Sequence, residues 1–258
     1  MAGRLDVQIP APDGHSAGTL HVPDGTGPWP GVLVFPDAGG VRETFGQMGD
    51  QLAGLGYVVL IPDIYYRAGE WAPFDVATLF TDPRERARMT GLVSALTNDA
   101  IIADAGAYAD FLLARPEVSG SAIGTTGYCL GGRMSLVAAG GLGRTIAAAA
   151  TFHGGRLAVA DDPSSPHLAA DRITAAVYVA GAIQDGSFTT EQAGLLDRAL
   201  TGAGVGTPSS SIPPGTGSRC PTTRPTTPER RPGTGTRSAG STATTWRPEH
   251  GRMPRSRR

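Results

Sequence analysis

The sequence predicts an α/β fold in which a mostly parallel β-sheet carries helices on both faces. Short apolar runs of strand length alternate with longer stretches whose apolar residues recur at helical spacing. In addition, two of the runs, GVLVFP (31–36) and YVVLIP (57–62), are apolar almost throughout. Strands of that composition are typical of parallel sheets, which are buried on both faces.

The predicted fold begins with a hairpin. Residues 4–23 are read as two antiparallel strands around a Pro-Asp-Gly turn at 12–14. An amphipathic helix is predicted over 44–55, between the two buried runs. Beyond them the clearest helix is 98–114, where apolar residues recur at helical spacing: Ile101, Ile102, Ala105, Tyr108, Ala109 and Leu112.

The later elements keep the same alternation. They are a strand at 121–127, a helix at 133–141, strands at 146–152 and 173–181, and a helix at 189–204. The last helix opens with Thr189 and Gln192, a pair typical of a capped helix N-terminus. The alternation stops at about residue 204.

The two ends of the chain differ sharply in charge. Residues 1–205 contain 12 Arg and 21 acidic residues, a net charge of −9, whereas residues 206–258 contain 10 Arg and 2 acidic residues, a net charge of +8. After Val205 there is no Leu, Val, Phe or Tyr, so this stretch offers neither a hydrophobic stripe nor an alternating strand. We therefore expect a domain over 1–205 whose C-terminal part is lost and replaced by a disordered Arg/Pro/Thr-rich tail over 206–258.

Several classes of protein are disfavoured by composition. Two cysteines, Cys129 and Cys220, are too few for a secreted disulfide framework. The N-terminus lacks the apolar core of a signal peptide, and no run approaches the ~18 apolar residues of a membrane span, so we expect a soluble cytoplasmic protein. No metal-ligand spacing occurs, and DAGG (37–40) and GYCLGG (127–132) lack the Lys of a P-loop, so no cofactor is predicted.

Cys129 is the residue that most directly indicates chemistry. It lies in GYCLG (127–131), between a predicted strand and a predicted helix, which is where α/β-hydrolases carry the nucleophile elbow. The glycines leave room around a strained turn. The helix N-terminus favours a thiolate, and the N–H of Leu130 would be one oxyanion donor. The alternative is a buried structural cysteine in a Gly-rich turn.

Two further residues follow predicted strands. Asp185, in GAIQDGSF, comes after the nucleophile in chain order, as an orienting carboxylate should in this fold; the alternative is an aspartate in a solvent-facing turn. His153, in TFHGG, is a candidate to line the binding pocket, or else a structural histidine. His15, His21 and His167 are poorly placed to act as a base.

Four motifs make the chain resemble the dienelactone hydrolases, from the first hairpin to about Val205. They are GYCLGG (127–132), FPDAGG (35–40), LGYVVLIPDIYYR (55–67) and VAGAIQD (179–185). The resemblance implies an α/β-hydrolase fold and the hydrolysis of a small lactone or ester. It also implies roles for five residues: Cys129 as nucleophile, Asp185 as the residue that orients the base, Asp37 and Ala38 as a loop carboxylate and an oxyanion amide, and Arg67 on a substrate carboxylate.

Two of these assignments have alternatives. The family often has glutamate where Asp37 stands, and Glu43 competes for that carboxylate. Arg67 could equally be a surface charge.

The histidine that the resemblance implies is missing from its expected place. The family carries it after the last strand in a motif of the form YPxxxHGF, but the only histidine after Val205 is His250, within the basic tail. The sequence therefore retains a nucleophile and an orienting carboxylate without the group that moves the proton between them.

A shifted reading frame would account for this loss. Lysine is absent and Ala, Gly, Pro and Arg abound, as expected of a gene rich in G and C. In the shifted frame, each new codon takes the last base of one present codon and the first two bases of the next. Read in this way, the codons of Gly215 to Ser218 are compatible with His-Gly-Phe. We hypothesise a frameshift between about residues 204 and 209, natural or from sequencing.

Three functions follow from these observations. The first is a dienelactone hydrolase-type enzyme that cleaves a lactone or ester through a cysteine and is disabled by loss of its histidine. The second is a non-catalytic relative that binds a carboxylated small molecule. The third, an arginine-rich arm that binds nucleic acid or an anionic surface, is disfavoured because the arginines of the tail are scattered among Pro, Thr and Gly. Oligomeric state and exact substrate stay open.

Overall fold

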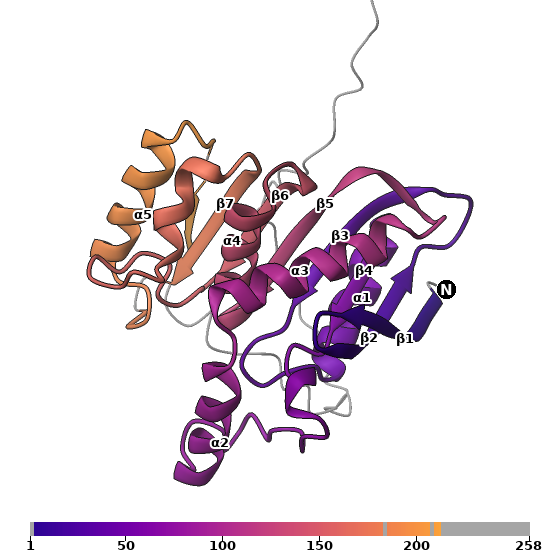
Figure 1. The fold of residues 1–258 in the computed structure, drawn as a ribbon, viewed down its shortest axis with the longest axis horizontal. Helices are drawn as coiled ribbons and strands as arrows, with labels where there is room; N and C mark the ends of the chain where they lie inside the picture. Colours follow the sequence, from indigo (N-terminus) through magenta and orange to yellow (C-terminus); the bar gives the residue numbers. More distant parts are fainter. Residues whose placement is uncertain (1–2, 183–184, 207–208, 213–258) are drawn as a thin grey trace, which may run out of the picture. The chain divides into compact units, whose positions relative to one another are not determined.

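An eight-stranded sheet forms the centre of the protein, with strand order β1-β2-β4-β3-β5-β6-β7-β8. The computed structural model describes residues 3–182, 185–206 and 209–212 (Figure 1). The strands are β1 (Gly3–Ala11), β2 (Gly14–Val22), β3 (Trp29–Phe35), β4 (Val58–Pro62), β5 (Val118–Tyr128), β6 (Ile146–Phe152), β7 (Ala176–Ala182) and β8 (Ser209–Ile212).

The sheet is mixed only at its N-terminal edge. Strands β1 and β2 form the predicted antiparallel hairpin, and β2 pairs antiparallel with β4. From β4 through β3 and β5 to β8, every neighbouring pair is parallel. The prediction of a mostly parallel sheet is confirmed, so the carboxyl ends of β3, β5, β6 and β7 lie along one edge of it.

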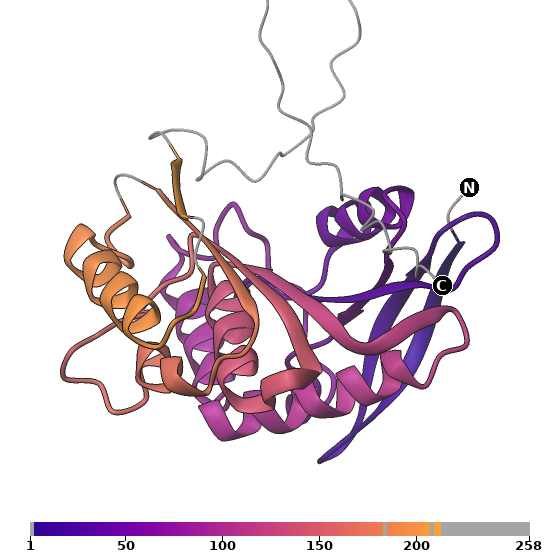
Figure 2. The same cartoon turned by 90° about the horizontal axis from the view of Figure 1, so that it is seen from above.

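Helices cover both faces of the sheet, as predicted (Figure 2). Helix α1 packs on β2 and β4, whereas α3 and α4 lie on the opposite side, with α4 against β5 and β6. The helices are α1 (Glu43–Gly54), α2 (Pro83–Ser94), α3 (Asn98–Leu113), α4 (Leu130–Leu142) and α5 (Thr190–Gly202), with short 3-10 helices η1 (Tyr66–Ala68), η2 (Gly143–Thr145) and η3 (Pro166–Arg172). None of the helices in the described part is both long and apolar enough to cross a membrane.

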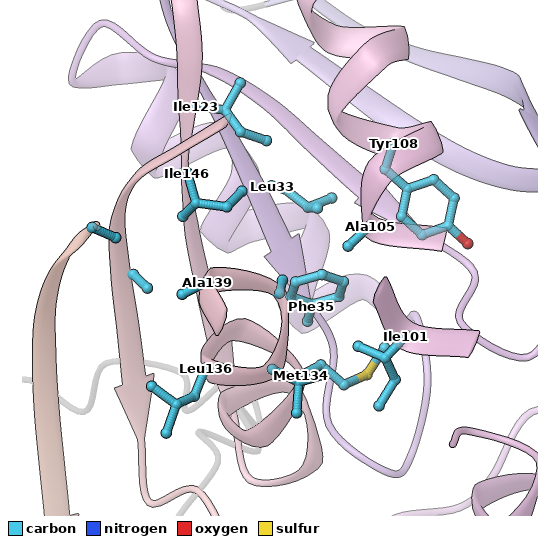
Figure 3. Packing of buried hydrophobic residues seen from close by; sticks show 14 of the residues in the cluster. Leu33, Phe35, Ile101, Ala105, Tyr108, Ile123, Met134, Leu136, Ala139 and Ile146 are labelled. Atoms are coloured by element: carbon cyan, nitrogen blue, oxygen red, sulfur yellow. The ribbon is translucent and has the colours of Figure 1, made fainter. Parts of the chain in front are cut away.

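The main core lies between the sheet and the helices α3 and α4 (Figure 3). It contains the side chains of Leu33, Phe35, Ile101, Ala105, Tyr108, Ile123, Met134, Leu136, Ala139 and Ile146. A smaller cluster, Val34, Phe45, Val59 and Ile61, lies under α1. The alternation of side chains along β3 sends Leu33 and Phe35 to one core and Val34 to the other, which explains why this strand is apolar throughout.

Helix α2 was not predicted from the sequence. Asp82 caps it by accepting a hydrogen bond from the N–H of Arg84 at 2.7 Å, and Pro83 occupies its first turn. These are recognisable start signals. No residue of α2 is fully buried, and its partly buried apolar residues Met89, Leu92 and Val93 all lie in its C-terminal half. The apolar pattern is therefore too short to predict the whole helix.

Strand β8 lies beyond the predicted end of the domain at Val205. Its backbone pairs with β7 from Val179–Ser209 to Ala182–Ile212. Composition predicts no strand here, but a short edge strand needs only its N–H and C=O groups to pair. Of the expected tail over 206–258, residues 207–208 and 213–258 lie outside the described residues, so the disorder of the tail stays a prediction.

Candidate active site

Cys129 occupies the sharp turn between β5 and α4. Its backbone has φ 53° and ψ −115°, and the first residue of α4 follows at once. A non-glycine residue with positive φ is uncommon, and such strain is typical of functional positions. A nucleophile elbow requires this arrangement of strand, left-handed residue and helix.

The positions of the glycines around Cys129 leave no room for a side chain, because neighbouring atoms approach their Cα atoms closely. A Cβ on Gly127 would lie 2.2 Å from the carbonyl oxygen of Gly131, and a Cβ on Gly131 would lie 2.2 Å from that of Phe35. On Gly132 it would lie 2.5 Å from Thr151 Oγ1. No side chain fits at these distances. The GYCLGG pattern therefore reflects packing of the elbow against β3 and β6.

The elbow places the half-buried Cys129 at the N-terminus of α4. The helix dipole at that end favours a thiolate over a thiol. Leu130 is the first residue of the helix, and the N–H groups of the first turn have no acceptor within a helix. The Leu130 N–H is therefore a backbone donor next to the Cys129 side chain that α4 leaves unpaired.

The loop after β3 lies next to the elbow. It runs from Asp37 to Gly40 and adjoins the elbow, because Gly131 packs on the carbonyls at the end of β3. Ala38 is buried, and within the described residues its N–H has no hydrogen-bond acceptor. This N–H is therefore a candidate donor to a bound ligand.

The two acidic candidates of this region lie in different places. Asp37 forms a bidentate ion pair with Arg42, with both N···O distances 2.6 Å, and stays inside the loop. Glu43 is 69% exposed and pairs with Arg4 of β1. Of the two, only Asp37 belongs to the loop that adjoins the elbow.

Tyr65 is a residue of this site that the sequence analysis missed. It is almost fully buried, and its hydroxyl donates to the carbonyl oxygen of Ala38 at 3.0 Å. Burial raises the pKa of its phenol, and the charges of Asp37 and Cys129 raise it further. The phenol therefore stays protonated and remains a hydrogen-bond donor.

Asp185 lies in the turn between β7 and α5. Its carboxylate accepts hydrogen bonds from the N–H of Ser187 at 2.8 Å and from the Ser187 hydroxyl at 2.6 Å. The same turn meets the segment after β6, since the N–H of Arg156 donates to the Ser187 carbonyl at 2.8 Å. Asp185 is thus held at the edge of the sheet where β5 and β6 also end.

His153 follows β6 at the same edge. It has positive φ (41°), and its N–H donates to the carbonyl oxygen of Ala180 at 2.7 Å. Its half-buried ring lies 6.0 Å from that of Tyr128, the residue before Cys129. His153 is therefore fixed by its backbone beside the elbow.

The other histidines of the described residues lie away from this edge. His15 is exposed in the hairpin, His21 contacts Asp50, and His167 contacts Ser165 in η3. His250 lies outside the described residues. Within those residues, no cluster of three or more His, Cys, Asp or Glu side chains could hold a metal ion.

Arg67 contacts protein carboxylates. Its guanidinium forms two hydrogen bonds with the buried Asp104, one of them 2.8 Å long, and a third of 2.5 Å with Asp13 of the hairpin. The hydrogen bond to Asp104 is the main cause of its raised pKa. A role on a substrate carboxylate stays a prediction, and it would require these contacts to be exchanged.

Comparison with known proteins gives one consistent result. The model of the Dienelactone hydrolase family matches residues 17–208. A carboxymethylenebutenolidase of Pseudomonas putida is 31% identical over 52% of this chain and 56% of its own length. The chain spans about half the length of the curated relatives it matches.

Solved structures show the same fold. A dienelactone hydrolase-like promiscuous phosphotriesterase from metagenomic libraries is 26% identical, with a TM-score of 0.66 and 84% of each chain covered. A structure from Klebsiella pneumoniae is 24% identical with a TM-score of 0.70, over 83% of this chain and 86% of that one. The second likeness concerns the fold alone.

Proposed function

The chain belongs to the dienelactone hydrolase family, and on that premise we propose that it cleaves a lactone or carboxylic ester with Cys129 as the nucleophile. One observation carries the proposal: the left-handed backbone of Cys129 between β5 and α4. A cysteine with a purely structural role does not require a strained backbone. In a nucleophile elbow, this backbone conformation holds the side chain above the edge of the sheet.

The reaction begins with attack of the Cys129 thiolate on the carbonyl carbon. A C–S bond forms, and the carbonyl oxygen becomes an oxyanion held by the N–H groups of Leu130 and Ala38. The C–O bond then breaks, and the leaving enolate or alkoxide takes a proton from water. The product at this stage is a thioester on Cys129.

Hydrolysis of the thioester needs a base that removes a proton from the attacking water. Asp185 is the proposed orienting group for a histidine at this place. The family's histidine motif is missing, and the match to the family ends at residue 208, within the interval proposed for the frameshift. We infer that this chain is acylated once and then stalls, and that restoring the frame would restore turnover.

The test is release of p-nitrophenolate from p-nitrophenyl acetate, followed from the first seconds to steady state. We expect a burst of about one equivalent followed by a very low rate, as for acyl-enzyme accumulation, and no burst in the Cys129→Ala variant. A chain with its frame shifted after Val205 should turn over continuously. In a Cys220→Ser background, which leaves Cys129 as the one cysteine, a burst that survives in Cys129→Ala would refute the nucleophile.

The second candidate is a relative that binds a small carboxylated molecule without converting it. The missing histidine motif is the observation in its favour. Saturable binding of a carboxylated lactone, measured by calorimetry, with no burst from any ester would select this function over the first.

A further inference from the structure

The loop that carries the Ala38 amide is held on one side by its own acidic residue. Asp37 accepts from the N–H of Gly39 through its carboxylate and from that of Gly40 through its carbonyl, both at 2.9 Å. Arg42 pairs with the same carboxylate. These bonds shape the turn from within the loop. The first engages the N–H of the peptide unit that carries the Ala38 carbonyl, and the second engages the carbonyl of the peptide unit that carries the Ala38 N–H.

On its other side the loop contacts two aromatic side chains. The Tyr65 hydroxyl donates to the Ala38 carbonyl oxygen, and the ring of Trp71 packs so closely on Gly40 that a Cβ there would lie 2.4 Å away. The rings of Tyr65 and Trp71 meet edge to face, with centroids 5.3 Å apart.

Asp63 fixes both aromatic residues. One carboxylate oxygen accepts from the backbone N–H of Tyr65 at 2.8 Å, and the other accepts from the indole N–H of Trp71 at 2.9 Å. Because Asp63 directly follows β4, the position of the Tyr65 hydroxyl is tied to the central sheet.

We infer that Tyr65 is a positioning residue: its hydroxyl holds the Ala38 carbonyl and thereby fixes the neighbouring Ala38 N–H where the oxyanion forms. The inference rests on the proposed acylation of Cys129. An oxyanion donor must be held at hydrogen-bonding distance from the developing charge before the reaction begins. Tyr65 provides this support from a different part of the fold than Asp37.

Two reactions of the same sulfur separate this role from a general effect on the thiol. Acylation by p-nitrophenyl acetate passes through an oxyanion. Alkylation by iodoacetamide forms a C–S bond and releases iodide without one. The full chain is used in a Cys220→Ser background, which leaves Cys129 as its one cysteine.

Tyr65→Phe should slow the acylation burst about tenfold, less than the loss of a whole oxyanion donor, and leave the alkylation rate within about twofold. Tyr66→Phe is the matched control, because that hydroxyl donates to Asp104 at 2.8 Å; its burst should match that of the parent chain. Trp71→Phe, which removes the indole bond to Asp63, should also slow acylation selectively. It serves as the test if Tyr65→Phe does not fold.

Equal acylation rates in Tyr65→Phe and the parent chain would overturn the inference while leaving the nucleophile intact. Equal losses in acylation and alkylation would also overturn it, because the effect would then lie in the thiolate. A parent chain whose burst survives Cys129→Ala would refute the proposed function instead.

Discussion

The backbone N–H of Cys129 donates to the carbonyl oxygen of Phe152 at 3.0 Å. The nucleophile candidate is therefore held by the neighbouring strand β6 as well as by β5 and α4. This bond continues the pairing of Tyr128 with Phe152 by one residue. The hydrogen bond to Phe152 fixes the turn at the end of the sheet. The position of the Cys129 thiol therefore depends on the pairing of β5 with β6.

Gly131→Ala should disrupt the elbow. The added Cβ would lie 2.2 Å from the Phe35 carbonyl oxygen, so β3 and α4 must separate, at a cost of about 3 kcal/mol or more in the free energy of unfolding. Gly91→Ala is the control, because nothing lies within 4 Å of its Cβ in α2 and alanine should stabilise that helix by about 0.5–1 kcal/mol. Urea unfolding monitored by circular dichroism measures both, and equal effects would contradict the packing described for the elbow.

Asp104→Asn should destabilise the protein strongly. Asp104 is 2% exposed and pairs with Arg67, so its loss leaves a guanidinium without its main partner, at a cost of about 3–5 kcal/mol. Asp13→Asn removes the other partner, which is 62% exposed, and should cost less than about 1 kcal/mol. Urea denaturation midpoints of Asp104→Asn and Asp13→Asn measure the two effects. Comparable midpoints would show that the buried ion pair contributes no more to stability than the exposed one.

His21 should make stability pH-dependent. It is fully buried, its Nδ1–H donates to Asp50 at 2.7 Å, and its Nε2 accepts from the Thr19 hydroxyl at 3.1 Å. Burial lowers its pKa; Arg4 also lowers it, and Asp50 and Glu43 partly oppose this.

The unfolded chain binds a proton at His21 below about pH 6.5, whereas the folded chain does so only at lower pH. The free energy of unfolding should therefore fall as the pH drops below about 6.5. His167 acts in the same direction because burial lowers its pKa too, so the measurement compares urea unfolding of the parent with His21→Gln between pH 7.5 and 5.5. A shallower decline in the variant is expected, and parallel curves would contradict it.

Asp185→Asn should affect the two versions of the chain differently. Under the proposed loss of the histidine, Asp185 has no base to orient, so the acylation burst should change less than about twofold. With the frame restored, the same substitution should lower turnover by about 100-fold or more, because the histidine loses its partner. A large loss of burst in the unrepaired chain would give Asp185 another role.

The fold was predictable from the sequence wherever an element shows a pattern of apolar or capping side chains. Strands β3 and β4 are buried on both faces, and their continuous apolar runs reveal them; the Thr189 cap of α5 is confirmed by its hydrogen bond to the N–H of Gln192 at 3.3 Å. Helix α2 and strand β8 escaped prediction for opposite reasons. No residue of the first is fully buried, and the second pairs through its backbone.

The site was predictable as a set of motifs but not as a set of contacts. In the sequence, Tyr65 and Tyr66 are two adjacent tyrosines. The fold directs the first hydroxyl to Ala38 and the second to Asp104. The pairing of Arg67 with Asp104 joins residues 37 positions apart, and local sequence does not encode such a pair.

At position 129 the backbone conformation favours glycine, whereas the proposed reaction requires a thiol. Glycine adopts positive φ without the cost, of order 1–3 kcal/mol, that a side chain incurs in such regions. Selection for stability alone would place glycine at position 129. A lineage that no longer used the reaction would therefore be free to exchange the thiol for glycine and recover that stability.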